Sequence, residues 1–157
     1  MKISFQLNGK PVAVECEPAD TLAEVLRNTF NLNGTKVSCE VQVCGACTVL
    51  VGGVPVSACT YLAYEARDRN VTTIEGLERP DGTLHPLQQA FIDEFAFQCG
   101  YCTPGMIMSA KALLDENPKP THDEIIHHMD GNICRCTGYV PIVAAALDAA
   151  KRLRDGA

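Results

Sequence analysis

Eight of the nine cysteines in this 157-residue chain fall into two groups of four. Four thiolates are the number that holds one tetrahedral metal ion or one small iron–sulfur cluster. We therefore predict two metal centres, and this requirement limits the fold more than any other feature of the sequence. The first group comprises Cys39, Cys44, Cys47 and Cys59, and the second comprises Cys99, Cys102, Cys134 and Cys136.

The first group has the spacing C-x4-C-x2-C followed by a distant fourth cysteine, which is the plant-type ferredoxin pattern for a [2Fe–2S] cluster. Three thiolates on one short loop approach two irons from one side, so the fourth must arrive from another element. The residues between Cys47 and Cys59 read as strand, Gly-Gly turn and strand. Such a hairpin is expected to return Cys59 to the loop.

The second group consists of two short pairs, Cys99/Cys102 and Cys134/Cys136, and we expect each pair to serve one iron. Side chains at positions i and i+2 of an extended segment point the same way, so Cys134 and Cys136 can converge.

Thr103 and Pro104 follow Cys102 and are predicted to be the N-cap and the first turn of a helix. The positive end of that helix would face the second centre and favour thiolate over thiol.

The hydrophobic pattern predicts an α+β fold in two domains. Residues 1–75 combine alternating strands, an Asn-Gly hairpin turn and a helix that starts at a capping box, which suggests a β-grasp, plant-ferredoxin-like domain. Residues 76–82 are rich in turn formers and charge and are predicted to be a linker. Residues 83–157 show helical periodicity and are predicted to form an all-α four-helix bundle around the second centre.

The charge and the hydropathy exclude two classes of partner. The net charge is −6 and no basic stripe is present, which argues against nucleic acid. No apolar run approaches the roughly 20 residues that cross a bilayer, and the first residues alternate like a strand instead of forming a signal-peptide core. We therefore expect a cytoplasmic protein that docks onto other proteins.

Two rival explanations of the cysteines fit the spacing less well. A zinc-binding structural or interaction module is the alternative, because C-x2-C pairs are common in zinc sites, but C-x4-C-x2-C and C-x1-C fit zinc poorly. A disulfide-stapled secreted domain is opposed by the odd cysteine count and by the start of the chain. Iron–sulfur centres are therefore preferred.

The remaining reactive residues are predicted to have no chemical role. Cys16 lacks a partner at ligand spacing and is expected to be a buried free thiol. The histidines, His85, His122, His127 and His128, are expected to be solvated, because no acid or thiolate completes a site with them. No arrangement of nucleophile, base and oxyanion donors is evident, so no catalytic residue is predicted.

Three motifs together resemble a known family. Residues 44–49 (CGACTV), 98–106 (QCGYCTPGM) and 131–139 (GNICRCTGY), in this order and separation, look like the small iron–sulfur subunit of molybdenum hydroxylases. This is the xanthine dehydrogenase family, which includes aerobic carbon monoxide dehydrogenases, aldehyde oxidoreductases and N-heterocycle hydroxylases. The resemblance covers nearly the whole chain and implies one [2Fe–2S] cluster in each domain.

The resemblance also implies partners and a direction. A large subunit would carry a molybdopterin-type molybdenum cofactor, a medium subunit would carry FAD, and the assembly would be a dimer of heterotrimers. Single electrons would pass from the molybdenum cofactor through the second and then the first cluster to FAD. Gln98 matches a glutamine that hydrogen-bonds the pterin, and Cys136 matches a ligand that also approaches the pterin amine.

The chain departs from the family pattern at two positions. The family often has glycine directly before the first ligand and again three residues after it, where this chain has Ser38 and Gln42. Glycine permits positive φ and a close approach of the backbone to sulfur. We therefore expect a changed potential of the first cluster.

Overall fold

The computed structural model describes residues 1–156. Alternating apolar residues place one face of β1 (Lys2–Leu7) in the core, and β1 pairs antiparallel with β2 (Lys10–Glu15). The turn between them uses Asn8 and Gly9 with φ of +50° and +77°, as a tight hairpin requires. The predicted opening hairpin is therefore present.

Three further strands complete one five-stranded sheet in the order β2-β1-β5-β3-β4. β3 (Thr48–Val51) and β4 (Val54–Ser57) form the second predicted hairpin, and β5 (Asn70–Thr72) lies between β1 and β3. β5 runs parallel to β1 and antiparallel to β3.

One face of the sheet is covered by a short helix. α1 (Leu22–Glu24) begins at a capping box in which Thr21 and Glu24 bond each other, and it continues as a π-helical turn, Val25–Thr29. Short 3-10 turns occupy Ala63–Ala66 and Ile74–Gly76. Leu22 and Leu26 are fully buried between this helix and the strands.

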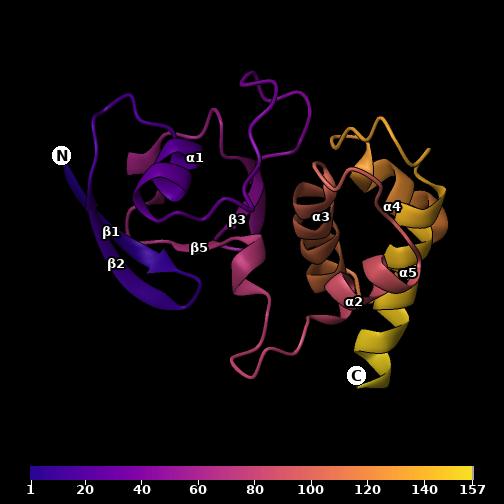
Figure 1. Ribbon diagram of the computed structural model, residues 1–157. Helices are drawn as coiled ribbons and strands as arrows, with labels where there is room; N and C mark the ends of the chain where they lie inside the picture. Colours follow the sequence, from indigo (N-terminus) through magenta and orange to yellow (C-terminus); the bar gives the residue numbers. More distant parts are fainter. Residues whose placement is uncertain (157) are drawn as a thin grey trace.

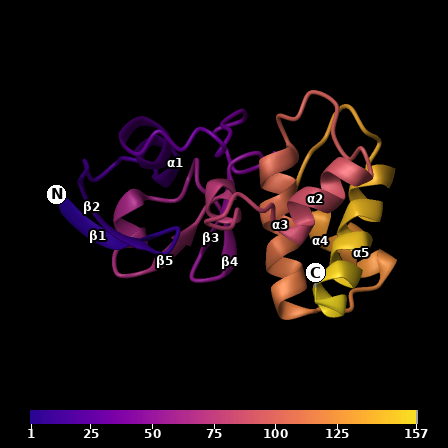
Figure 2. The same cartoon turned by 60° about the horizontal axis from the view of Figure 1, so that its bottom comes forward.

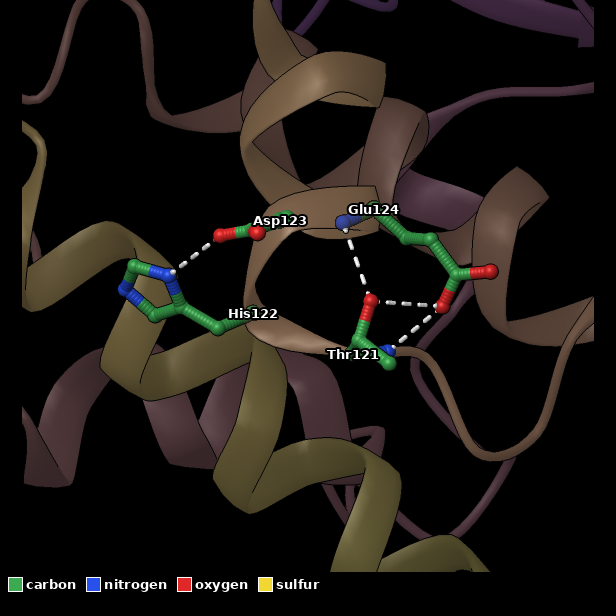
Figure 3. Close-up of polar contacts among 4 residues, drawn as sticks. All are labelled: Thr121, His122, Asp123 and Glu124. Atoms are coloured by element: carbon green, nitrogen blue, oxygen red, sulfur yellow. Dashed lines mark hydrogen bonds and ion pairs between the residues drawn. The ribbon is translucent and has the colours of Figure 1, made fainter.

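Within residues 1–156, four α-helices follow the sheet in the sequence, and they gather on one side of it (Figures 1 and 2). α4 starts at a capping box formed by Thr121 and Glu124 (Figure 3). α2 and α5 pack together, and α3 lies against β3 and β4 of the sheet, so the two halves share an interface. The helices are α2 (Pro86–Asp93), α3 (Thr103–Glu116), α4 (His122–Met129) and α5 (Val140–Asp155).

The predicted fold class is confirmed as an α+β ferredoxin-like domain followed by a helical domain. Within the predicted linker, Leu77 is only 7% exposed and packs with the core of the helices. Within residues 1–156, no helix has both the length and the apolar character that crossing a membrane requires.

Candidate metal centres

The first candidate centre lies on a loop that folds its own N–H groups toward sulfur. The N–H groups of Val43 and Cys44 each donate to the Cys39 Sγ at 3.4 Å. Backbone hydrogen bonds, from Val41 first and then from Val43 and Cys44, lower the pKa of Cys39 to about 6. The loop therefore favours a thiolate at Cys39.

The fourth cysteine of this centre returns as predicted. The hairpin formed by β3 and β4 brings Cys59 beside Cys47, and the Cys59 N–H donates to the Cys47 Sγ at 3.5 Å. Both side chains are buried, and burial raises the pKa of Cys47 to about 12. The sulfurs of this group thus meet as Cys39 with Cys44 and Cys47 with Cys59.

The second candidate centre pairs its cysteines differently from the prediction. The Cys136 thiol hydrogen-bonds the Cys99 sulfur at 3.7 Å, and the Cys102 thiol bonds that of Cys134. Each sulfur therefore meets one from the other segment, whereas the sequence suggested that Cys99/Cys102 and Cys134/Cys136 could each serve one iron. The two segments run side by side, which sequence proximity could not reveal.

The second centre also contains one buried pair and one exposed pair. Burial raises the pKa of Cys102 to about 12, followed in size by its hydrogen bond to Cys134. Burial opposes deprotonation of Cys134 as well, but a 3.2 Å contact with the Thr137 hydroxyl helps to lower the pKa of that thiol. Cys99 and Cys136 are exposed.

The helix after Cys102 starts one residue earlier than predicted. Cys102 is the N-cap of α3 and Thr103 is its first residue, so Thr103 is not the cap. The buried Thr103 hydroxyl forms no hydrogen bond with any residue that the structure describes. Because Cys102 is the N-cap residue of α3, the free N–H groups at the start of this helix lie beside the second group of cysteines.

Gln98 joins the two cysteine segments of the second centre. Its Nε2 donates to the Cys136 carbonyl at 2.9 Å. α2 ends at Asp93, so Gln98 lies in the loop that follows this helix. Gln98, Cys99 and Cys136 are all exposed, and the bonds from Gln98 to Cys136 and from Cys136 to Cys99 place them together at the surface.

Residues 1–156 contain no group of three or more His, Cys, Asp or Glu arranged around a single metal ion. The cysteines meet in pairs instead. Two pairs of thiolates, with N–H donors beside them, are a donor set that suits an iron–sulfur cluster, whose irons each take two cysteines. The residues of both groups therefore fit such a cluster.

The two positions at which the sequence departs from the family pattern differ in backbone conformation. Gln42 has a φ of +60°, the conformation that glycine adopts most easily, whereas Ser38 has no positive φ. The Gln42 side chain accepts a bond from the Thr60 hydroxyl at 3.2 Å. Glu40, with a φ of +58°, was not anticipated, because glutamate gives no signal for that conformation.

Cys16 and the histidines were predicted to have no chemical role. Cys16 is a buried free thiol, as expected. His122 and His127 are exposed on α4. Among residues 1–156, the ring of His122 makes a polar contact only with Asp123 (Figure 3), and that of His127 only with Asp130. His85 is half-buried and caps α2, since its Nδ1 accepts from the Leu87 N–H. His128 is also partly buried, with its Nε2 3.0 Å from the Ser109 carbonyl oxygen. Both findings correct the expectation that these histidines are solvated.

Sequence reasoning missed Asn132 and Gly105. Asn132 is 6% exposed and donates to the Gly45 carbonyl at 3.0 Å, and a Cβ at Gly105 would collide with the same carbonyl oxygen. The signal for Asn132 was its place two residues before Cys134. The signal for Gly105 was a glycine inside the first turn of a helix, which usually has a packing reason.

The comparisons with known proteins agree with this architecture. Residues 5–73 match the model of the 2Fe-2S iron-sulfur cluster binding domain, and residues 73–147 match that of the [2Fe-2S] binding domain. The chain is 48% identical over 150 residues to the nicotinate dehydrogenase small FeS subunit of Eubacterium barkeri, covering 96% of this chain and 95% of that protein.

Two further relatives extend the match. A probable xanthine dehydrogenase subunit from Bacillus subtilis is 45% identical over 150 residues, covering 96% of this chain and 86% of the relative. A chain of the crystal structure of quinoline 2-oxidoreductase from Pseudomonas putida 86 superposes with a TM-score of 0.94 at 44% identity, covering 99% of this chain and 97% of that one. The chain therefore belongs to the small iron–sulfur subunits of the xanthine dehydrogenase family of molybdenum hydroxylases, and is a non-catalytic subunit of an oxidoreductase.

Proposed function

We propose that this chain relays single electrons from a molybdenum cofactor on a large partner subunit, through two [2Fe–2S] clusters, to FAD on a medium partner subunit. One observation carries the proposal: two separate groups of four cysteines each bring their sulfurs together in pairs. An iron–sulfur cluster accepts and releases one electron at a time. Two clusters in one chain can therefore divide a two-electron oxidation into single steps.

All eight cysteines are proposed as iron ligands. In the first centre Cys39 and Cys44 would hold one iron, and Cys47 and Cys59 the other. This assignment is supported by the N–H groups that donate to the Cys39 and Cys47 sulfurs, because such donors stabilise anionic thiolates and tune a cluster. In the second centre, the same reasoning assigns one iron to Cys99 and Cys136 and the other to Cys102 and Cys134.

The second centre is proposed to face the molybdenum subunit. Gln98, Cys99 and Cys136 share one exposed edge, where Gln98 and Cys136 would contact the pterin. Close by in sequence, Phe95, three residues before Gln98, and Val140, four residues after Cys136, are 80% and 78% exposed. Large apolar groups left in water beside a predicted centre support a protein interface at this edge.

The first centre is proposed to face the FAD subunit. Val41 and Val43 of the cysteine loop are 65% and 59% exposed, although loops of this kind are usually polar. Two apolar side chains beside Cys39 and Cys44 suit a second protein contact. The two proposed contacts lie on different domains, as a relay between two subunits requires.

The organisation around this function is proposed as follows. Residues 1–75 would be a β-grasp domain, residues 83–157 a four-helix bundle, and residues 76–82 their linker. The chain would work in the cytoplasm, where thiols stay reduced and available to iron, within a dimer of heterotrimers.

The substrate of the complex is proposed to be selected by the partner subunits. The relatives are named for nicotinate, xanthine and quinoline, yet this chain is 44% to 48% identical to the iron–sulfur chains of all three. Because this chain is about equally similar to all three, its sequence singles out none of these substrates, which suits a subunit that carries electrons and does not choose the substrate.

The test is anaerobic co-expression with the large and medium subunits encoded beside it, followed by metal analysis and spectroscopy of the complex. We expect a red-brown protein that is bleached by dithionite, with about four irons and four labile sulfides per chain. Electron paramagnetic resonance (EPR) should resolve two distinct signals in the reduced complex. A colourless chain with stoichiometric zinc would refute the proposal and favour the zinc module.

A further inference from the structure

The loop of the first centre is inserted between the two segments that carry the second. On one side, a Cβ at Gly105 in the first turn of α3 would collide with the Gly45 carbonyl oxygen. On the other side, a Cβ at Gly45 would collide with the Asn132 amide and the Gly131 carbonyl. Only glycines at positions 45 and 105 permit this approach.

Asn132 fixes the inserted loop through its side chain. Its Nδ2 donates to the Gly45 carbonyl at 3.0 Å and to the Thr48 hydroxyl at 3.4 Å, and that hydroxyl donates to the same carbonyl at 2.7 Å. Gly45 follows Cys44, and Thr48 follows Cys47. One buried amide therefore holds the residues next to two proposed ligands of the first centre.

The next residue completes a direct connection between the centres. The Ile133 N–H donates to the Cys44 carbonyl at 2.9 Å. Cys44 is a proposed ligand of the first centre, and Ile133 is bonded to Cys134, a proposed ligand of the second. A covalent path interrupted by one hydrogen bond thus runs from one ligand set to the other.

We propose that Asn132 is a positioning residue for electron transfer between the two centres, because it holds the Cys44 carbonyl against the Ile133 amide. This inference rests on the proposed function. In the step concerned, one electron leaves the second centre, which is oxidised, and enters the first, which is reduced; no bond forms or breaks and no proton is transferred. Electronic coupling falls steeply with separation and faster across a gap than along bonds, so widening the 2.9 Å contact would slow this step.

Asn132 itself touches no sulfur among the described residues, so its effect is on geometry. Leucine has the same number of side-chain heavy atoms and the same branching as asparagine but no donor, and Asn132→Leu would leave the Gly45 carbonyl facing an apolar group. The matched control is Tyr101→Phe, which removes another hydrogen bond between the two halves, from the Tyr101 hydroxyl to the Val37 carbonyl at 2.5 Å, and leaves the Cys44 contact intact.

The experiment uses the complex with its clusters, reduced by a rapid pulse and sampled by freeze-quench EPR. We expect Asn132→Leu to slow electron transfer from the second centre to the first several-fold, while a redox titration gives unchanged midpoint potentials. Tyr101→Phe should retain the native rate. An unchanged rate in Asn132→Leu, or an equal loss in Tyr101→Phe, would overturn the inference.

A second measurement applies even if Asn132→Leu assembles poorly. Hydrogen exchange of the Ile133 amide, followed by mass spectrometry, reports how often the contact opens. The native complex should protect this amide, and Asn132→Ser should lose protection roughly tenfold, equivalent to about 1.4 kcal/mol. Rapid exchange in the native complex contradicts the inference, whereas a chain without iron and sulfide contradicts the proposed function instead.

Discussion

The two candidate centres differ in how their cysteines are brought together. The first takes three of four from residues 39–47, and the N–H groups of that same loop donate to its sulfurs. The second joins segments far apart in sequence, so that Cys136 meets Cys99 and Cys134 meets Cys102. Local chain geometry shapes the first centre, whereas the second depends on the packing of the helices.

The first centre does not depend on its own loop alone, because residues outside the loop also form hydrogen bonds with it. Asn132 and Ile133, which belong to the second centre's segment, bond the carbonyls of Gly45 and Cys44. Within residues 1–156, no hydrogen bond from a strand of the sheet reaches a sulfur of the second centre. A disturbance of the helical half should therefore reach the first centre more easily than a disturbance of the sheet reaches the second.

The largest expected effect comes from removing one proposed ligand from each centre. Cys59→Ala should abolish the first centre alone and Cys134→Ala the second alone, and each should lower iron from about four to about two per chain. Metal analysis and EPR of the complex separate the two losses.

Cys16→Ala is the control for these two variants, because it removes a buried thiol that stands outside both groups of four. It should keep all the iron and both EPR signals. Full iron content in Cys59→Ala or Cys134→Ala would remove that cysteine from the ligand set.

A smaller effect is expected from disturbing the close contact at Gly45 between the first cysteine loop and the helical domain. Gly45 and Gly52 have similar φ, +68° and +62°, but only Gly45 of these two is crowded by neighbours. Gly52→Ala should cost about 1 kcal/mol of unfolding free energy from backbone strain alone. Gly45→Ala should cost about 1 to 3 kcal/mol more, because the added methyl overlaps the Asn132 amide.

Denaturant unfolding of the complete chain measures both variants under the same conditions. Equal losses of unfolding free energy in the two variants would mean that the contact at Gly45 is loose and that the first loop is not stabilised by the helical domain.

The sequence predicted those features that depend on short-range pattern. Alternation indicated the hairpins, and the capping boxes at Thr21 and Thr121 indicated two helix starts. The return of Cys59 to the cysteine loop followed from the hairpin between Cys47 and Cys59.

The features that the sequence did not predict depend on how distant segments pack. The cross-pairing in the second centre requires the paths of both cysteine segments, and the bond from Asn132 to Gly45 spans 87 positions. The buried Leu77 in a stretch of turn formers and charges is a similar case, since its burial is decided by the helices that cover it.

A further prediction separates the potentials of the two centres. Gln42→Gly should relax the positive φ and release the Thr60 hydroxyl, which is bonded to Gln42 next to Cys59. The first-centre midpoint potential should shift by up to about 40 mV, the equivalent of about 1 kcal/mol for one electron. The second-centre potential should stay constant.

Ser38→Gly is the matched comparison, because Ser38 has no positive φ to relax. It should shift the first-centre potential less than Gln42→Gly in an EPR-monitored titration. No shift in either variant would show that the departures from glycine in this loop do not tune the centre.

The smallest effects compare the two capping boxes, which are alike although they stand in different halves. Thr21→Ala and Thr121→Ala should each lower the unfolding free energy by about 1 kcal/mol, through loss of the bonds of the threonine hydroxyl, which Figure 3 shows for Thr121. Thr121→Ser should restore most of the loss, since serine keeps the hydroxyl.

The same boxes predict a weak dependence on acid. Hydrogen bonds from the backbone and the hydroxyl of Thr21 lower the pKa of Glu24, and those of Thr121 do the same for Glu124. A lowered folded-state pKa contributes stability above the ordinary glutamate value of about 4.3, which is lost as pH falls through the folded-state pKa. In Thr21→Ala and in Thr121→Ala, the unfolding free energy should therefore fall less steeply as the pH is lowered from 5 to about 3. An effect in Thr121→Ala alone would mean that the helical half unfolds first in acid. Such an order would agree with the dependence of that half on tertiary packing.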